Sequence, residues 1–178
     1  MNKALFLDRD GIINVDHGYV YQSENFEFVE DIFSFCQLAQ DKGYLLIVIT
    51  NQSGIGRGKY TVEQFQELTE WMKEQFKSNK VNINAVYFCP HHPMKGQGEY
   101  LKECDCRKPN PGMIIQAAAE HNVDLKQSIF IGDKVSDMKA AEAAGIDKRI
   151  LVASQYQDVV DIKAHRVDDI AQACLFID

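Results

Sequence analysis

The sequence predicts an α/β fold with a doubly wound, mostly parallel sheet and helices on both faces. Apolar, β-rich runs alternate with amphipathic helical segments along the whole chain, an order that produces a parallel sheet crossed by helices. The run YLLIVIT is continuously apolar, as expected of a parallel strand covered on both faces. At 178 residues, we expect one domain, residues 1–178, large enough to bury its own core.

In the first half of the chain, three strand runs alternate with two helical segments. Between the runs 4–7 and 44–50, residues 31–43 carry apolar side chains at helical spacing and end at a glycine, a common C-cap. Residues 61–76 open with a Thr-x-x-Gln capping box and place their apolar side chains on one face. The segment AVYFC, residues 85–89, predicts the third strand.

The second half continues the same alternation. Residues 110–121 begin with Asn-Pro, which predicts a helix with the asparagine as N-cap and the proline in its first position. Residues 128–132 and 149–152 are apolar strand runs, and 136–145 form a short helix that ends at a glycine. The last segment, 167–177, has the pattern of a final helix.

Composition and charge exclude some functions. A net charge of −7 and a pI near 5.2 argue against a nucleic-acid partner, which needs Lys and Arg to neutralise phosphates. No run approaches the roughly 20 apolar residues of a membrane span, so we expect no membrane partner. Asp8 and Asp10 interrupt the N-terminal apolar run too early for a signal peptide. We therefore expect a cytoplasmic protein, whose thiols more often bind metal than form disulfides.

Polar side chains follow three predicted strands, at the strand ends where open α/β sheets bind ligands. These are Asp8 with Asp10, Thr50 to Ser53, and Asp133 with Asp137, and Lys108 lies in the loop after the third strand. Singly, each could be a turn residue or a surface charge. Clustered carboxylates suit Mg²⁺ shared with a phosphate, and a lysine and a hydroxyl can bind phosphate oxygens. One carboxylate can attack phosphorus while a second transfers protons, so the set predicts phosphoryl transfer.

Four segments, FLDRDG, IVITNQSG, CRKPNPGM and IFIGDKVSDM, resemble the four motifs of the haloacid-dehalogenase-like phosphatases. The resemblance implies a Rossmann-like fold, with Asp8 as nucleophile and Asp10 as general acid and base. It makes Thr50 and Lys108 the pair that stabilises the transferred phosphoryl group. These residues would be the catalytic set of a Mg²⁺-dependent phosphatase.

The same resemblance implies a magnesium site formed by Asp8, the backbone carbonyl of Asp10, and Asp133. Asp137 matches the second acidic position of the fourth motif, where it would support either Mg²⁺ through water or Lys108. Only about 40 residues separate the first two motifs, and one predicted helix occupies most of them. This leaves no room for an inserted cap domain, so we expect an open site and a monomer.

A cysteine–histidine cluster lies between the second and third motifs. It consists of Cys89-x-His91, twelve intervening residues, and Cys104-x-Cys106. Three thiolates and one imidazole suit tetrahedral Zn²⁺ and leave no open coordination position, so this zinc would be structural. The zinc loop, residues 89–106, would then be held by its metal and lead into Arg107 and Lys108. His92 is a rival fourth ligand, and unpaired thiols with surface histidines are the plainer alternative.

The zinc loop narrows the resemblance. Within the family, CPHHP followed by CDCRKPNPGM is similar to the corresponding segments of the D-glycero-D-manno-heptose-1,7-bisphosphate 7-phosphatase group. This resemblance implies that the protein removes the 7-phosphate through an aspartyl-phosphate intermediate. The reaction would belong to ADP-heptose and lipopolysaccharide core biosynthesis. The implied substrate contacts are Asp16, His17, Gly18, Tyr19, Thr50, Asn51, Gln52, Ser53, Arg107, Lys108 and Lys134. Arg107 suits the second phosphate of such a substrate because guanidinium binds phosphate bidentately.

Two alternatives remain open at this stage. Relatives with a similar zinc loop hydrolyse histidinol phosphate, so histidinol phosphate or another small sugar phosphate could be the substrate. A non-enzymatic phospho-acceptor or a zinc-loop binding module is the alternative from another class. A phospho-acceptor receiver would carry its acidic pair before an acceptor on a later strand. Here Asp10 follows Asp8 in the turn after the first strand, where it can supply the acid that turnover needs.

Overall fold

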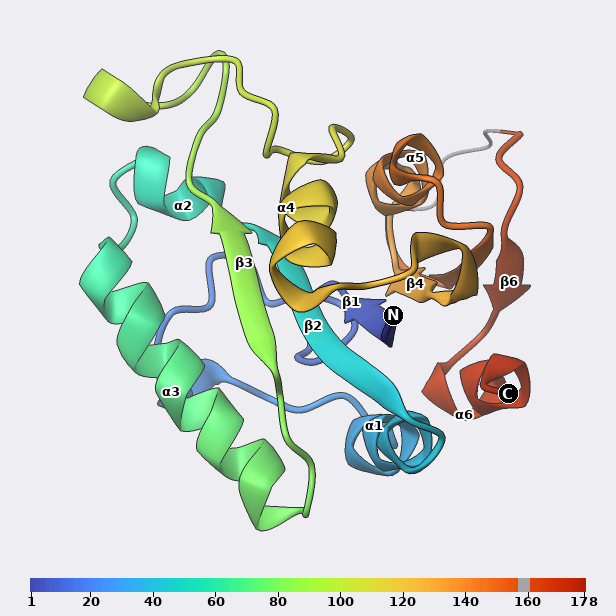
Figure 1. The fold of residues 1–178 in the computed structure, drawn as a ribbon. Helices are drawn as coiled ribbons and strands as arrows, with labels where there is room; N and C mark the ends of the chain where they lie inside the picture. Colours follow the sequence, from blue (N-terminus) through green and yellow to red (C-terminus); the bar gives the residue numbers. More distant parts are fainter. Residues whose placement is uncertain (157–160) are drawn as a thin grey trace.

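The computed structural model describes residues 1–156 and 161–178, and its centre is a parallel sheet of six strands in the order β3-β2-β1-β4-β5-β6 (Figure 1). The strands are β1 (Lys3–Leu7), β2 (Tyr44–Asn51), β3 (Ala85–Cys89), β4 (Ile129–Gly132), β5 (Lys148–Val152) and β6 (His165–Val167). Every neighbouring pair is parallel. The predicted fold class is therefore confirmed.

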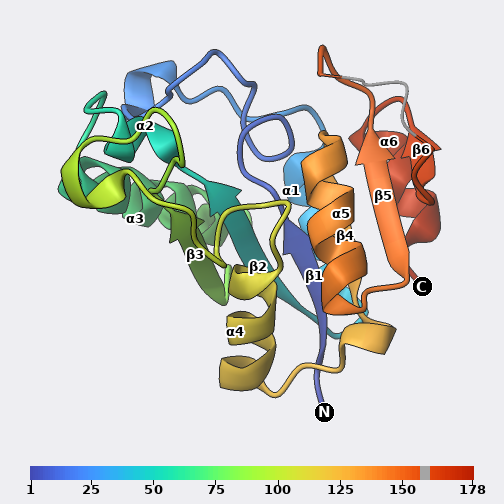
Figure 2. The ribbon, with the colours of Figure 1, turned by 90° about the horizontal axis from the view of Figure 1, so that it is seen from above.

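Helices cover both faces of this sheet (Figure 2). The α-helices are α1 (Ile32–Asp41), α2 (Ser53–Gly56), α3 (Val62–Ser78), α4 (Gly112–His121), α5 (Val135–Ala144) and α6 (Ile170–Ala173). Short 3-10 helices are η1 (Ser23–Asn25), η2 (Gly98–Tyr100), η3 (Leu125–Gln127) and η4 (Cys174–Phe176). Residues of α1, α3 and α6 pack on one face, and residues of α4 and α5 on the other.

The core is split into two clusters by the alternation of side chains along each strand. In β1, Leu5 and Leu7 face the cluster of α1 and α3, whereas Ala4 and Phe6 face the cluster of α4 and α5, because successive strand side chains point to opposite faces. All four are fully buried. The strands β1, β2 and β4 are therefore rigid supports for whatever follows their carboxyl ends.

The strand order reverses at β1. From β1 the chain adds β2 and β3 on one side, and β4, β5 and β6 on the other. In open α/β sheets, this switch point forms a crevice at the carboxyl ends of the strands, where ligands bind. The predicted catalytic residues come from this edge of the sheet. Asp8 and Asp10 follow β1, Thr50 lies near the end of β2, and Lys108 lies in the segment between β3 and α4.

Two helix predictions need correction. The helix predicted at 167–177 is instead the end of β6, the short helix α6 and the 3-10 helix η4, because Val167 pairs with Val152 of β5 and Asp169 caps the new helix. The predicted N-cap Asn110 does not cap α4, which has Pro111 in that position. The Asn110 amide instead donates to the Cys104 carbonyl oxygen at 2.8 Å.

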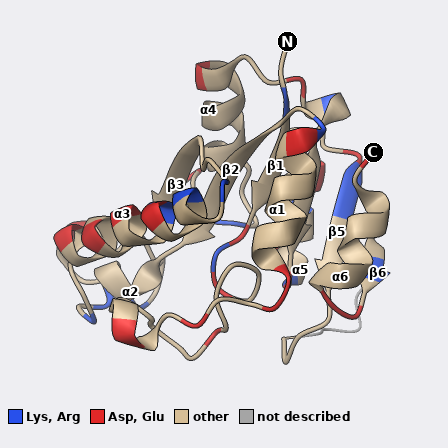
Figure 3. Ribbon diagram, turned by 90° about the horizontal axis from the view of Figure 1, so that it is seen from below, with Lys and Arg blue, Asp and Glu red and all other residues tan. Residues whose placement is uncertain are grey.

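Other local predictions are confirmed. Thr61 and Gln64 form both halves of the capping box that begins α3. Gly43 and Gly145 follow α1 and α5 with φ of 87° and 95°, the left-handed conformation that ends helices. Figure 3 shows acidic residues repeated along α3. Among the described residues, no helix is long and apolar enough to cross a membrane.

Candidate active site

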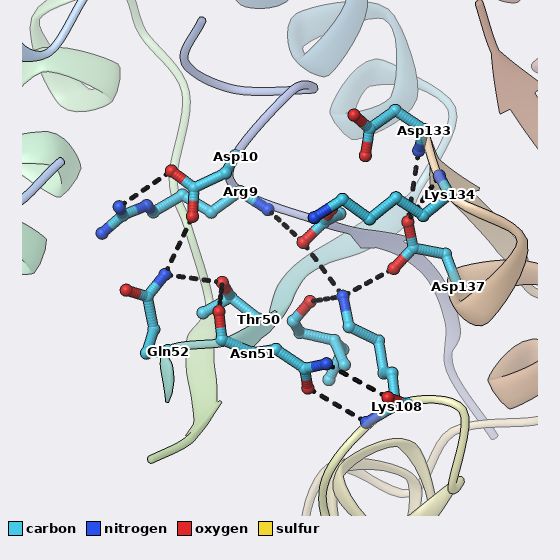
Figure 4. Close-up of polar contacts among 11 residues, drawn as sticks. Arg9, Asp10, Thr50, Asn51, Gln52, Lys108, Asp133, Lys134 and Asp137 are labelled. Atoms are coloured by element: carbon cyan, nitrogen blue, oxygen red, sulfur yellow. Dashed lines mark hydrogen bonds and ion pairs between the residues drawn. The ribbon is translucent and has the colours of Figure 1, made fainter. Parts of the chain in front are cut away.

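A buried lysine joins two carboxylates at the switch point (Figure 4). The Lys108 ammonium lies 2.9 Å from Oδ1 of Asp8 and 2.6 Å from Oδ1 of Asp137, and it donates to the Ile49 carbonyl oxygen at 2.9 Å. Asp8 follows β1, Asp137 lies in the first turn of α5, and Lys108 precedes α4. Burial disfavours the charged lysine, but Asp137 and Asp8 outweigh it and raise the pKa of Lys108. The lysine is therefore a fixed cation beside Asp8.

Asp137 has three polar contacts that explain its position. Its Oδ1 forms an ion pair with the Lys108 ammonium. Its Oδ2 accepts hydrogen bonds from the backbone N–H groups of Asp133 and Lys134 at 3.2 and 3.1 Å (Figure 4). The sequence left open whether Asp137 supports Lys108 or a metal. The structure places it in direct contact with Lys108 and within the carboxylate cluster.

The carboxylates Asp8, Asp133 and Asp137 fit a divalent cation. Their oxygen atoms lie within 4.8 Å of one another, and Oδ1 of Asp133 is buried without a hydrogen-bond partner among the described residues. Gly11 has φ of +93°, and a Cβ there would lie 2.1 Å from Oδ2 of Asp133. The glycine therefore leaves room for the Asp133 carboxylate, and hard oxygen donors of this kind suit Mg²⁺.

The electrostatics of the cluster point to the same cation. Burial, then the charges of Asp8 and Asp137, raise the pKa of Asp133 to about 9. Burial and Asp137 raise the pKa of Asp8 to about 6, although Lys108 lowers it. Carboxylates that repel in this way are relieved by a bound cation, which favours their ionised forms.

Asp10 lies outside this cluster, in a network of hydrogen-bond donors. Its Oδ1 accepts from Nη2 of Arg9 and Nδ2 of Asn14, both at 3.0 Å, and its Oδ2 accepts from Nε2 of Gln52 at 3.1 Å. Burial favours the neutral acid, but Arg9, Asn14 and Gln52 outweigh it and lower the pKa of Asp10. The side chain is thus held as a carboxylate, the form of a general base.

Two predicted substrate contacts hold other site residues in place. The amide of Asn51 donates to the Lys108 carbonyl oxygen at 3.1 Å and accepts from the Lys108 N–H at 3.0 Å. The amide of Gln52 donates to Oγ1 of Thr50 at 2.8 Å, and its Oε1 accepts from the hydroxyl of Tyr60. Tyr60 was not predicted, since nothing in its sequence surroundings marks it.

The four predicted zinc ligands converge. Sγ of Cys89 lies 3.5 Å from Nδ1 of His91, 3.5 Å from Sγ of Cys104 and 2.8 Å from Sγ of Cys106. Sγ of Cys106 lies 3.4 Å from both Nδ1 of His91 and Sγ of Cys104. The three sulfurs lie closer together than the tetrahedral edge of about 3.8 Å that Zn–S bonds of about 2.3 Å would set, most of all Cys89 and Cys106. Three thiols and one imidazole whose ligand atoms all lie within 4.8 Å of one another are nevertheless the type of donor set that binds Zn²⁺. The chain's four protein donors would fill the coordination sphere of a structural ion.

His92 does not join this set. Its Nδ1 accepts hydrogen bonds from the backbone N–H groups of Met94 and Lys95 at 3.1 and 3.0 Å. These two hydrogen bonds to His92 stabilise the turn of the zinc loop. Of the two histidines that the sequence offered as the fourth ligand, the structure therefore places His91 with the thiols.

A pocket of about 360 Å³ opens beside Asp10. It is lined by predicted substrate residues, namely Asp16, Gly18, Tyr19, Asn51, Gln52, Ser53, Arg107 and Lys134. Thr50 and Lys108 do not line it and are buried. His17 does not line it and lies 3.6 Å from Glu27 at the surface.

Besides Tyr60, three further pocket residues, Gly54, Arg57 and Tyr156, were missed. Tyr156 follows β5, so the rule that ligands bind at strand ends could have identified it. Arg57 lies in the turn that ends α2, in GIGRGK, which resembles an ordinary basic loop. Only the folded structure shows that Arg57 lines this pocket.

The fold, the switch-point carboxylates and Lys108 define a haloacid-dehalogenase-like hydrolase. A family model described as HAD-hydrolase-like matches residues 105–173. A solved structure described as a HAD-like phosphatase from Mesorhizobium loti has a TM-score of 0.87 and 32% identity, over 99% of this chain and 85% of that chain.

Curated relatives are similar to this chain and carry the name of one kind of phosphatase within this class. The D-glycero-beta-D-manno-heptose-1,7-bisphosphate 7-phosphatase of Vibrio cholerae is 52% identical over 84% of this chain and 80% of the relative. The Escherichia coli K12 protein of the same name is 47% identical over 84% and 78%. The D,D-heptose 1,7-bisphosphate phosphatase of B. bronchiseptica, solved with magnesium and phosphate, has a TM-score of 0.85 and 25% identity over 98% and 97%. The chain belongs to the same family of HAD-like phosphatases as these proteins.

Proposed function

We propose that this protein hydrolyses the 7-phosphate of D-glycero-D-manno-heptose 1,7-bisphosphate. The observation that carries the proposal is the buried triad of Asp8, Lys108 and Asp137 beside Asp133 at the switch point. The names of relatives that are 52% and 47% identical over 84% of the chain supply the substrate. A product that keeps its 1-phosphate is the expected result.

The proposed reaction begins with Asp8. Its carboxylate attacks phosphorus, the bond between phosphorus and the leaving sugar oxygen breaks, and Asp10 gives that oxygen a proton. Lys108 and the Thr50 hydroxyl stabilise charge on the transferred group. Asp10, again a carboxylate, then removes a proton from the water that hydrolyses the aspartyl-phosphate.

We further propose the resident metals of the site. Asp8, Asp133 and the Asp10 carbonyl would hold Mg²⁺, which when bound neutralises phosphate charge. Asp137 keeps its contact with Lys108. The four donors of the zinc loop would hold a structural Zn²⁺. A single domain over residues 1–178, a monomeric state and a cytoplasmic location stay proposals, the last because thiolate zinc ligands suit a reducing compartment.

The test is a substrate comparison with Mg²⁺ present. Heptose 1,7-bisphosphate and histidinol phosphate are given to the purified protein in parallel, and phosphorus NMR identifies the remaining sugar phosphate. We expect a higher kcat/KM for the bisphosphate and a 1-phosphate product. Preference for histidinol phosphate, or loss of the 1-phosphate, would overturn the substrate. Full activity of an Asp8→Asn variant would overturn the mechanism.

A further inference from the structure

The Gln52 side chain connects two of the predicted catalytic residues (Figure 4). It is buried, and its amide nitrogen donates to Oγ1 of Thr50 at 2.8 Å and to Oδ2 of Asp10 at 3.1 Å. A primary amide has two N–H donors, so these two contacts use both of them. The direction of the Gln52 amide therefore affects Thr50 and Asp10 together.

The same direction decides where the Thr50 hydroxyl can donate its proton. Oγ1 of Thr50 accepts from Gln52, and its own proton reaches the Asn51 carbonyl oxygen only at 3.4 Å, which is long for an O–H donor. The proton is thus available to a phosphate oxygen. If the amide turned over, its oxygen would face Thr50, and the hydroxyl would donate to Gln52 instead. The Asp10 carboxylate would then meet a second acceptor in place of a donor.

Tyr60 stabilises the observed direction of the amide. Its hydroxyl donates to Oε1 of Gln52. The Tyr60 side chain is 6% exposed, and its ring stacks on the Tyr21 ring with centroids 5.4 Å apart. A Cβ on Gly54 would lie 2.3 Å from Cε1 of Tyr60, so this glycine of α2 leaves room for the ring. Burial raises the pKa of Tyr60, which keeps its hydroxyl protonated and able to donate.

We propose that Tyr60 is a positioning residue, which holds the Gln52 amide so that the Thr50 hydroxyl donates its proton to the transferred phosphoryl group. The inference rests on the proposed function, and Tyr60 acts in it through Gln52. Without the Tyr60 hydroxyl, the buried amide oxygen gains a donor by turning towards Thr50. Thr50 then loses its hydrogen bond to phosphate, and the Asp10 carboxylate loses the donor that Gln52 supplies.

The test is a double-mutant cycle between Tyr60 and Gln52. Tyr60→Phe removes the hydroxyl and keeps the ring, and Gln52→Met removes the amide and keeps the length of the side chain. The kcat/KM for heptose 1,7-bisphosphate is measured with Mg²⁺ for wild type, both single variants and the double variant. We expect Tyr60→Phe alone to lower kcat/KM by about 10-fold. In the Gln52→Met background, the same substitution should change it by less than about 2-fold, because no amide is left to orient.

Tyr21→Phe is the matched control. It removes a hydroxyl from the ring stacked on Tyr60, but Tyr21 does not line the active-site pocket, and its kcat/KM should equal that of wild type. A role of Tyr60 in packing alone would lower kcat/KM equally with and without the Gln52 amide. That result, or an unchanged kcat/KM in Tyr60→Phe, would overturn the inference and leave the proposed function standing.

Failure of the proposed function has a different signature. If wild type does not hydrolyse the heptose bisphosphate, the cycle is measured with p-nitrophenyl phosphate and, if that is also inert, as the Kd for inorganic phosphate with Mg²⁺. A loss of about 10-fold in Tyr60→Phe that disappears in the Gln52→Met background supports the inference. Equal effects in both backgrounds, or no binding of phosphate to wild type, overturn it. Thermal midpoints verify that each variant is folded at the assay temperature, and Gln52→Leu replaces Gln52→Met if the latter is not.

Discussion

Replacing Asp137 with asparagine should change stability by an amount that depends on Mg²⁺. The neutral amide keeps the size of the side chain but cannot serve Lys108 and the backbone N–H groups of Asp133 and Lys134 equally, since only one of its ends accepts hydrogen bonds. Breaking one partner of a buried ion pair costs about 3–5 kcal/mol. The same substitution also removes a negative charge from a crowded cluster.

The free energy gained by removing the negative charge of Asp137 can be calculated from its distance to Asp8. Oxygen atoms of Asp8 and Asp137 lie within 4.8 Å, where two unit charges at an effective dielectric of about 20 repel by about 3.5 kcal/mol. Asp133, whose pKa is raised to about 9, is neutral near pH 7 and adds little. Without metal, the loss and the relief nearly cancel, and we expect a net destabilisation of roughly 0–1.5 kcal/mol.

With Mg²⁺ bound, the cation has already removed the repulsion, so the full loss of about 3–5 kcal/mol should appear. By linkage, the affinity of the variant for Mg²⁺ should fall by about two to three orders of magnitude. Urea unfolding in chelator and in saturating Mg²⁺ measures both penalties, and calorimetric titration measures the affinity. Asp147→Asn, at an exposed carboxylate 3.3 Å from Lys126, should cost below about 0.5 kcal/mol in both conditions. Equal penalties for Asp137→Asn with and without Mg²⁺ would refute this reasoning.

Three further predictions concern neighbouring parts of the site. Because the raised pKa of Asp133 keeps it protonated below about 9, Mg²⁺ binding should release a proton at pH 7.5, seen in weakly buffered titrations, and almost none above pH 10. Tyr60→Phe leaves a buried oxygen of Gln52 without its donor and should cost about 1–3 kcal/mol in urea unfolding; an unchanged midpoint would contradict this. Cys104→Ser should lose bound zinc, measured by atomic absorption, whereas Cys174→Ser should keep it.

The positions of the predicted catalytic and metal-binding carboxylates could be predicted because they follow from strand topology. Asp8 and Asp133 come directly after apolar strand runs, and parallel neighbouring strands bring such ends to one edge. The pairing of β1 with β4 then places both carboxylates together. An apolar strand run followed by an aspartate was therefore enough to predict that Asp8 and Asp133 lie together, because the parallel sheet brings the strand ends to one edge.

Other features depended on contacts that no local pattern contains. Residues 167–177 have helical spacing, yet pairing of Val167 with Val152 overrides it and creates the three-residue strand β6. His91 and His92 are chemically identical neighbours, and only the turn of the zinc loop separates their roles. Asn110 is a favourable N-cap by type, but its amide is used by the carbonyl of Cys104.

The state of Asp10 connects the geometry to the two halves of the proposed reaction. Arg9, Asn14 and Gln52 hold it as a carboxylate, which suits the removal of a proton from water but not the donation of one to a leaving oxygen. A substrate phosphate between Asp8 and Thr50 brings negative charge close to Asp10, and like charge raises the pKa of a carboxyl group. Substrate binding would thus prepare the acid form. Transfer of that proton to the leaving sugar oxygen would return Asp10 to its carboxylate, the base form for hydrolysis of the aspartyl-phosphate.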